Sequence, residues 1–230
     1  MNEQIIINNI AKLLERVRLV VGKCQRKEGD ITVLAVSKTR SSSQLRVAYQ
    51  RGFRNFGENY LSEALAKIEE LQDLDIVWHF IGPVQSNKTR QIAEHFDWIH
   101  SVDRLKIARR LSEQRPNHLP PLQICIQVNI SEEMNKSGAT LAELPELARD
   151  ITALPHITLR GLMAIPEATT DPVSQRAAFA KLNKAMLSLQ TQMPQLDTLS
   201  MGMSGDMEAA IAEGSTIVRI GTDIFGPRNM

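Results

Sequence analysis

Apolar runs alternate with amphipathic stretches along most of this chain. Residues 5–21 carry apolar side chains spaced i, i+4 and i+7, a period that predicts an amphipathic helix ahead of the first strand. Short runs rich in Val, Ile, Leu and Phe then recur, and polar or glycine-containing turns bound them. These runs predict eight strands, at residues 31–37, 55–57, 77–81, 98–101, 123–129, 157–163, 198–200 and 216–220.

Helical periodicity fills the segments between the predicted strands. Ser42 or Ser43 is predicted to cap the helix that follows the first strand, with Gly52 at its end. Asp103 is predicted to cap the helix after the fourth strand. Further helices are predicted at residues 61–71, 87–95, 141–153, 172–192 and 206–214. The chain is therefore a regular alternation of strand and helix.

The number of strands favours one fold over its competitor. Eight strands separated by helices, at spacings of roughly 20 to 40 residues, predict an α/β fold, a single (β/α)8 TIM barrel with an additional N-terminal helix. An open doubly wound sheet would usually carry a glycine-rich dinucleotide turn after its first strand, where this chain has Ser37-Lys38-Thr39-Arg40. No stretch rich in Pro, Gly or Ser is long enough to be a linker, so residues 1–230 are predicted to form one domain.

Composition and charge argue against several classes of protein. The 230 residues carry a formal net charge of +1, which gives no electrostatic footprint for nucleic acid. No run approaches the roughly 18 apolar residues of a membrane span, and the N-terminus lacks the basic region of a secretion signal. We therefore expect a cytoplasmic protein. A monomer is also expected, because no large apolar stripe stays exposed once the helices pack on the barrel.

The two cysteines are Cys24 and Cys125. A chain of this length buries enough surface to need no disulfide, so both thiols are expected to be reduced packing residues. Neither has a second cysteine or a histidine at metal-ligand spacing, and no metal site is predicted.

Lys38 is the residue that points most clearly to chemistry. It directly follows the first predicted strand, and barrels gather their functional groups at the carboxyl ends of their strands. An ordinary lysine has a pKa of about 10.4, so at pH 7 only about one in two thousand is the neutral amine that attacks a carbonyl. Desolvation beside apolar side chains would raise that fraction. The alternative is a lysine that ends an exposed strand and extends into water.

The loops after the seventh and eighth strands are suited to an anion. Ser204 offers a hydroxyl and a helix cap in the first loop, while Gly221 and Thr222 offer close backbone approach and a hydroxyl in the second. Ordinary turn and cap chemistry is the alternative for each loop alone. Arg219 shares one side of the last strand with Gly221 and needs an acceptor, either a carboxylate or a ligand's phosphate or ring nitrogen. Closure of a barrel makes the strands of Lys38 and Arg219 neighbours.

A series of short motifs stands in order along nearly the whole chain. They are Leu34-Ala35-Val36-Ser37-Lys38-Thr39, Phe56-Gly57-Glu58-Asn59-Tyr60, Trp78-His79-Phe80-Ile81-Gly82-Pro83, Gln85-Ser86-Asn87-Lys88, Asn135-Lys136-Ser137-Gly138, Gly161-Leu162-Met163-Ala164-Ile165-Pro166, Ser204 to Glu208, Val218-Arg219-Ile220-Gly221-Thr222 and Ile224-Phe225-Gly226. Together they resemble the pyridoxal phosphate homeostasis protein family, whose fold is similar to the N-terminal barrel of alanine racemase.

The resemblance implies that pyridoxal 5′-phosphate (PLP) is the cofactor, held as a Schiff base on Lys38. It also implies phosphate contacts from Ser204, Gly221 and Thr222, and an approach of Arg219 to the pyridine nitrogen. A guanidinium at that position disfavours protonation of the ring nitrogen. The cofactor is then a weaker electron sink, which suits holding it better than carbanion chemistry.

Two further residues are expected near the cofactor. Asn59 follows the second strand and is expected to contact the ring or its 3-hydroxyl, with capping of the next helix as the alternative. Met163 ends the sixth strand and is expected to pack near the site, with core filling as the alternative. His79 is expected to be a satisfied core histidine. The charge-rich run 132–136 is expected to be a solvated or mobile loop.

Three functions compete. The favoured one is a protein without catalytic residues that stores, buffers or delivers PLP, and so affects vitamin B6 and amino-acid balance, with transient recipient apo-enzymes as partners. The second is a PLP-dependent amino-acid racemase. Related racemases take an acid/base tyrosine from an added C-terminal domain, whereas Tyr49 and Tyr60 both lie in the predicted barrel. The third is a Schiff-base aldolase that uses the same lysine and anion loops without a cofactor.

Overall fold

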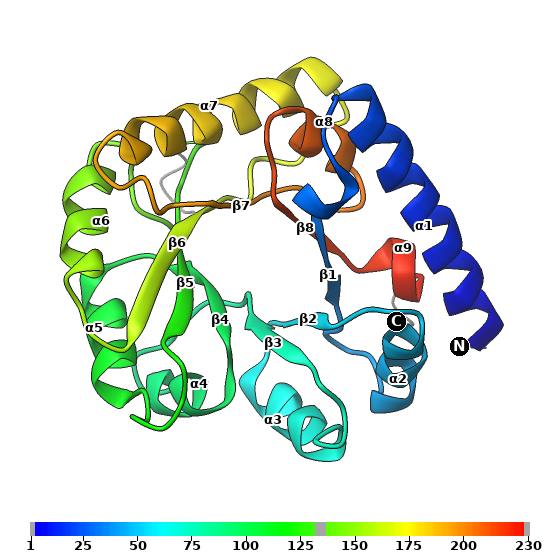
Figure 1. Cartoon of the computed structure of the whole chain (residues 1–230), viewed down its shortest axis with the longest axis horizontal. Helices are drawn as coiled ribbons and strands as arrows, with labels where there is room; N and C mark the ends of the chain where they lie inside the picture. The colour runs from blue at the N-terminus through cyan, green and yellow to red at the C-terminus, as the bar shows by residue number, and fades with distance from the viewer. Residues whose placement is uncertain (1–2, 132–136, 228–230) are drawn as a thin grey trace.

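Eight parallel strands close into a barrel in sequence order (Figure 1). The computed structural model describes residues 3–131 and 137–227. The strands are β1 Thr32–Val36, β2 Asn55–Glu58, β3 Val77–Phe80, β4 Trp98–Val102, β5 Leu122–Gln127, β6 Ile157–Met163, β7 Thr198–Ser200 and β8 Ile217–Ile220. β1 pairs with both β2 and β8, which closes the barrel and confirms the predicted fold. The run 132–136, expected to be a solvated or mobile loop, lies outside the described residues.

Helices cover the outside of the barrel (Figure 1). They are α1 Glu3–Lys23, α2 Ser42–Gln50, α3 Leu61–Glu70, α4 Thr89–His95, α5 Leu105–Gln114, α6 Leu144–Thr152, α7 Pro172–Gln190, α8 Met207–Ala212 and α9 Thr222–Phe225. α1 is the additional N-terminal helix that the apolar stripe predicts. α9 was not predicted, because four residues are too few to show a helical period.

Two helix caps differ from the prediction. α2 begins at Ser42, and its N-cap is Ser41, which has extended backbone angles (φ −75°, ψ 154°). Ser42 and Ser43 therefore already lie in the first helical turn, and the predicted cap was wrong by one or two positions. α5 begins after Arg104, its N-cap, so Asp103 is not the cap. The Asp103 carboxylate instead accepts two hydrogen bonds from the Arg104 guanidinium, at 2.7 and 2.8 Å.

α1 lies along one side of the barrel, against α2, α8 and α9 (Figure 1). The predicted apolar stripe has six members, and α1 buries five of them, Ile6, Ile10, Leu13, Val17 and Val21. The sixth, Leu14, is 44% exposed, so its inclusion in the stripe was wrong. Full burial of an aliphatic side chain contributes about 1.5–3 kcal/mol, so packing rather than helix propensity fixes this helix. Polar residues between these positions are thereby held at fixed places beside the last two strand–helix units.

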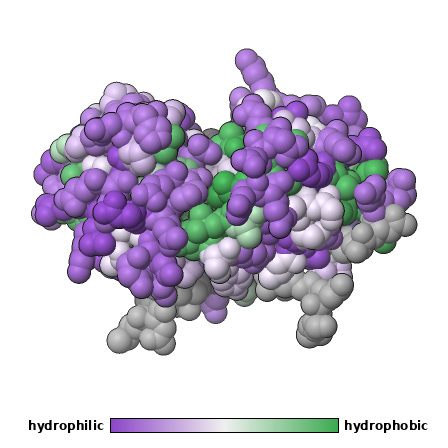
Figure 2. All heavy atoms as spheres, turned by 90° about the horizontal axis from the view of Figure 1, so that it is seen from below, coloured by the Kyte–Doolittle hydropathy of each residue, from purple (hydrophilic) through white to green (hydrophobic). Residues whose placement is uncertain are grey.

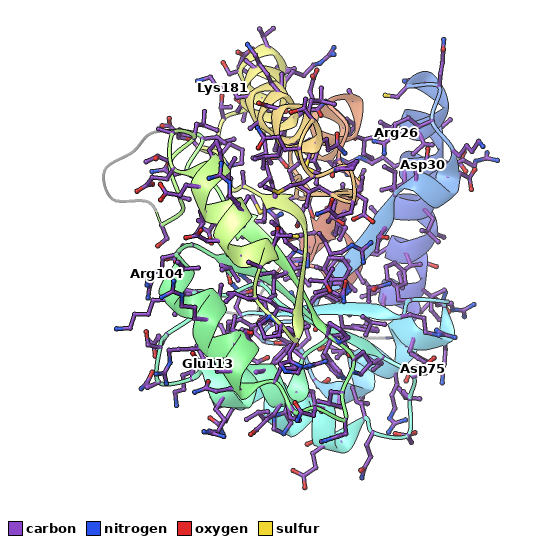
Figure 3. All side chains as sticks on the ribbon, turned by 60° about the vertical axis from the view of Figure 1, so that its left-hand side comes forward. Arg26, Asp30, Asp75, Arg104, Glu113 and Lys181 are labelled. Atoms are coloured by element: carbon purple, nitrogen blue, oxygen red, sulfur yellow. The ribbon has the colours of Figure 1, made fainter. Side chains whose placement is uncertain are left out.

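The face of the molecule seen from below is largely polar (Figure 2). In the view from below, hydrophilic residues cover most of the face, and apolar atoms gather in a band across its middle (Figure 2). Arg104, Glu113 and Lys181 are exposed and extend outward from the ends and outer faces of α5 and α7 (Figure 3). Among the described helices, none is long and apolar enough to cross a membrane.

Cys24 and Cys125 are both free thiols. Burial raises the pKa of the Cys125 thiol to about 12, so this side chain is a neutral packing group at pH 7. Within residues 3–131 and 137–227, no group of three or more His, Cys, Asp or Glu side chains could hold a metal ion.

Candidate functional site

A cavity of about 260 Å³ opens at the carboxyl ends of the strands. Its walls are Val36, Lys38, Asn59, Ile81, Ile165, Met203, Ser204, Gly205, Arg219, Gly221 and Thr222. The barrel therefore brings together every predicted cofactor-binding residue except Met163. Met163 is almost completely buried at the end of β6 and is not among the residues that line this cavity, so its approach to a cofactor stays a prediction.

Hydrogen bonds on both sides of Lys38 set its position. The Ser37 amide donates to Gly57 O at 2.9 Å, which continues the β1–β2 pairing to the residue before the lysine. Thr39 then adopts a left-handed conformation, φ +63°, and its amide donates to Glu63 Oε1 at 2.5 Å. A β-branched residue in this region is strained by roughly 1–3 kcal/mol, so the surrounding contacts must hold it. The turn places the partly buried Lys38 at the cavity.

A buried ionic cluster supports this turn. Lys67 Nζ donates to Ser37 O and to Glu58 Oε1, both at 2.7 Å, and to Glu63 Oε1 at 2.5 Å. The Ser37 hydroxyl donates to the same Glu58 oxygen at 2.6 Å. Glu58 is fully buried, and desolvation raises its pKa although Lys67 opposes the shift. Through Ser37 and Glu63, the cluster is bonded to the backbone on both sides of the cavity lysine.

Sequence reasoning missed this cluster. Glu63 and Lys67 stand four residues apart on α3, a spacing that is ordinary for an exposed helix pair. The usable signal was Glu58, a carboxylate at the end of a short predicted strand, which needs a partner if the barrel buries it. Only the folded barrel shows that its partner is Lys67.

Asn59 contributes an unused acceptor. Its Oδ1 atom is buried and has no hydrogen-bond partner among the described residues. An unsatisfied buried amide costs about 1–3 kcal/mol, so the site is incomplete without a donor. Asn59 does not cap α3, because the N-cap of that helix is Tyr60. A Cβ added at Gly82 would lie 2.1 Å from Asn59 O, so this glycine permits the close approach of the two loops.

The two predicted anion loops lie side by side at the cavity. Ser204 belongs to the turn after β7, while Gly221 and Thr222 join β8 to α9. Ser204 does not cap α8, whose N-cap is Asp206, and the cap part of that prediction was wrong. Gly202 has φ +96°, and an added Cβ would lie 2.5 Å from an alanine Cβ of α8. Glycine is therefore required where this loop folds back onto α8.

Arg219 is buried beside the cavity, with three fixed acceptors. Its Nη1 donates to Ser200 O at 2.6 Å and to Ser200 Oγ at 2.9 Å, and its Nη2 donates to Ala164 O at 2.9 Å. These partners are carbonyls and a hydroxyl, and no ion pair of Arg219 with a carboxylate is seen among the described residues. Burial lowers the pKa of Arg219 to about 10, which leaves the guanidinium protonated at pH 7.

The hydrogen bonds of Arg219 continue through the barrel interior. Ser200 Oγ lies 2.7 Å from His100 Nδ1, His100 Nε2 lies 2.9 Å from His79 Nδ1, and His79 Nε2 lies 2.9 Å from Asn55 Oδ1. Burial lowers the pKa of His79 to about 3 and that of His100 well below its ordinary value, so both rings are neutral. The Arg219 guanidinium can only donate, and Asn55 Oδ1 at the other end can only accept. Ser200 Oγ therefore donates to His100, His100 donates to His79, and His79 donates to Asn55. The expected core histidine, His79, is confirmed.

Removal of the Ser200 hydroxyl should destabilise the fold. In Ser200→Ala, His100 Nδ1 loses its donor and one Arg219 N–H loses an acceptor, both inside the barrel. We expect the free energy of unfolding to fall by about 2–3 kcal/mol, from about 1–3 kcal/mol for each buried unpaired group. Urea denaturation measures the change, and Ser188→Ala on the exposed face of α7 is the matched control. An equal stability of the two variants would contradict the hydrogen-bond chain.

Comparison with known proteins places the chain in a family. A family model described as alanine racemase, N-terminal domain, matches residues 9–229. The chain is 57% identical to the pyridoxal phosphate homeostasis protein of Pseudomonas aeruginosa, over 97% of this chain and 96% of that protein. It is 52% identical to the protein of the same name from Escherichia coli strain K12, over 97% of each.

Solved structures share the barrel. PipY of Synechococcus elongatus with PLP bound is 38% identical and has a TM-score of 0.82, with 96% of this chain and 100% of that chain covered. Alanine racemase from Corynebacterium glutamicum is 16% identical with a TM-score of 0.73, over 99% of this chain and 62% of that chain, and shows the fold alone. The similarity of sequence, at more than half identity over nearly the full length, means that this chain belongs to the pyridoxal phosphate homeostasis protein family.

Proposed function

We propose that this protein binds PLP covalently through Lys38 and serves vitamin B6 homeostasis rather than catalysis. The observation that carries the proposal is that Lys38 and Arg219 share one cavity with both anion loops. PLP requires this combination, an amine for its aldehyde and donors for its phosphate. The unsatisfied Asn59 Oδ1 fits as well, because the 3-hydroxyl of the cofactor is a donor. A relative with PLP bound, PipY, supports the same assignment.

The residues have separate tasks in this proposal. The Lys38 amine bonds to the aldehyde carbon, and one water leaves. The hydroxyls of Ser204 and Thr222 and the backbone at Gly221 hold the phosphate. Bound PLP supplies an electron sink for amino-acid chemistry. Arg219, which Ser200 and Ala164 hold in place, would weaken that sink if the ring nitrogen lay beside it, because its positive charge would disfavour a second charge there.

The residues that line the cavity support a role in binding PLP rather than in amino-acid racemization. Of the described residues that line it, Lys38 and Arg219 are the ones with titratable side chains. Racemization also needs an acid or base on the face of the cofactor opposite the lysine. Tyr49 and Tyr60 do not line the cavity, and Tyr60 is 55% exposed to solvent. No observation favours the cofactor-free aldolase.

Proton exchange distinguishes a PLP holder from an enzyme. PLP-loaded protein is incubated with L-alanine in D₂O, and loss of the α-proton signal is followed by NMR. We expect no exchange at rates typical of enzymes, on the order of 1 per second or faster. An alanine racemase under the same conditions is the positive control. Exchange at such rates by this protein would contradict the proposal and favour a PLP-dependent amino-acid racemase.

As a PLP holder, the protein is proposed to be a cytoplasmic monomer that delivers PLP to transient recipient apo-enzymes, without nucleic-acid or membrane partners. Delivery is tested by mixing the loaded protein with an apo-enzyme that PLP activates. The activity of the apo-enzyme should recover faster with the loaded protein than in a control mixture that contains the Lys38→Ala variant and the same concentration of PLP. Light scattering tests the monomer against the chain mass of 25.8 kDa.

A further inference from the structure

Arg16, on α1, binds the loop after β7 and the first turns of α8 and α9 from outside the barrel. Its Nη2 donates to Ser204 O at 3.0 Å. Its Nε and Nη2 donate to the two oxygens of the Glu208 carboxylate in a bidentate arrangement, with an Nη2–Oε2 distance of 2.9 Å. Its Nη1 donates to Asp223 Oδ2 at 2.6 Å, and Asp223 directly follows Thr222. One guanidinium therefore joins the loop after β7 and the start of α8 to the start of α9.

The packed helix holds Arg16 in this position. Leu13 and Val17, on either side of it along α1, are buried at 2% and 7% exposure. α1 runs beside α8 and α9 (Figure 1). The residues that Arg16 bonds lie 188 to 207 positions further along the chain. Arg16 does not line the cavity, so it can act on a ligand there only through the loops.

Arg16 also balances charge at the site. Glu208 and Asp223 place two carboxylates in the first turns of α8 and α9, directly after the loops that are to hold a phosphate. The hydrogen bond from Arg16 keeps the pKa of Glu208 below its ordinary value, so this carboxylate is ionised at pH 7. Without a cation the pair would repel a phosphate. Single exposed ion pairs contribute little, but a forked arginine with several partly buried partners is the arrangement that does contribute.

We propose that Arg16 is a positioning residue that gives the site its preference for phosphorylated over unphosphorylated pyridoxal. It holds the Ser204 loop and the start of α9 in their anion-binding arrangement, and it neutralises the carboxylates of Glu208 and Asp223. The proposal rests on the proposed function, because it requires PLP at Lys38. Pyridoxal has the same ring and aldehyde with a hydroxymethyl group in place of the phosphate ester, so it does not need these loops.

Arg16→Ala and Arg18→Ala are compared with the natural protein. Arg18 is an exposed residue on the same helix that pairs with Glu15, which makes it the matched control. PLP and pyridoxal are titrated separately, and binding is followed by absorbance. We expect Arg16→Ala to bind PLP at least about tenfold more weakly, about 1.4 kcal/mol, and pyridoxal within about twofold of the natural protein. Arg18→Ala should bind both as the natural protein does. Circular dichroism checks that each variant is folded.

The ratio of the two affinities decides the result. An equal loss for PLP and pyridoxal would reduce Arg16 to a general stabiliser of the fold, and no loss for either would remove its role; both outcomes overturn the proposal. Should Arg16→Ala not fold, Arg16→Lys keeps the positive charge without the fork and should lose PLP affinity selectively, by about threefold. Failure of the natural protein to bind PLP at Lys38 would instead overturn the proposed function.

Discussion

Lys38→Ala is expected to abolish the borohydride-stable PLP adduct of this protein. The natural protein should carry about one reduced adduct per chain, because the covalent link needs the one amine that the cavity presents. Lys67 cannot replace it, since its three donor positions are used by Ser37, Glu58 and Glu63 in the buried cluster. Peptide mass mapping after reduction measures both the amount of adduct and its position.

The control for this experiment is Lys181→Ala. Lys181 is exposed on α7 and does not line the cavity (Figure 3). Its removal should leave the adduct unchanged in amount and in position. An undiminished adduct in folded Lys38→Ala would contradict the assignment of this lysine and, with it, the proposed function.

The barrel and most of its site could be predicted from the chain because their signals are local. Strand and helix periods predict the alternation, and the strand count predicts closure. Lys38, Ser204 and Thr222 each follow a predicted strand, so topology alone brings them to one end of the barrel. Met163 shows the limit of this reasoning, because a residue at a strand end can be buried without lining the cavity.

The features that could not be predicted depend on contacts between distant segments. The bond from Arg16 to Asp223 spans 207 residues, and the bond from His100 to Ser200 spans 100. No spacing rule relates such residues, because their proximity follows from the stagger of strands and the packing of α1. The short helix α9 and the Ser41 cap were missed for a different reason. Four residues are too few to show a helical period, and adjacent serines differ too little for a sequence pattern to choose the cap.

Lys67→Met is expected to lower the free energy of unfolding by about 3–5 kcal/mol at pH 7, the usual cost of leaving a buried charge unpaired. Glu58 is fully buried, and its second oxygen, Oε2, has no hydrogen-bond partner among the described residues. Without Lys67 it would keep only the Ser37 hydroxyl. Urea denaturation measures the loss, and Lys181→Met is the control, with a change within about 0.5 kcal/mol.

A double variant separates the charge from the packing. In Glu58→Gln with Lys67→Met, the buried carboxylate and its cation are both absent, and a neutral replacement of a buried pair is often tolerated. We therefore expect the double variant to be more stable than Lys67→Met alone, which is a coupling that two independent sites would not show. A simple addition of the two single losses would mean that packing, not charge, accounts for the effect.

The destabilisation by Lys67→Met should also depend on pH. Burial raises the pKa of Glu58 above its ordinary value of 4.5, and loss of the opposing lysine raises it further. A carboxyl whose pKa is raised by folding stabilises the fold below its ordinary pKa, and that contribution is lost as pH rises through the raised pKa. The loss should therefore be smallest near pH 4.5 and grow toward pH 8. A constant loss across this range would show that Glu58 is not the group left unpaired.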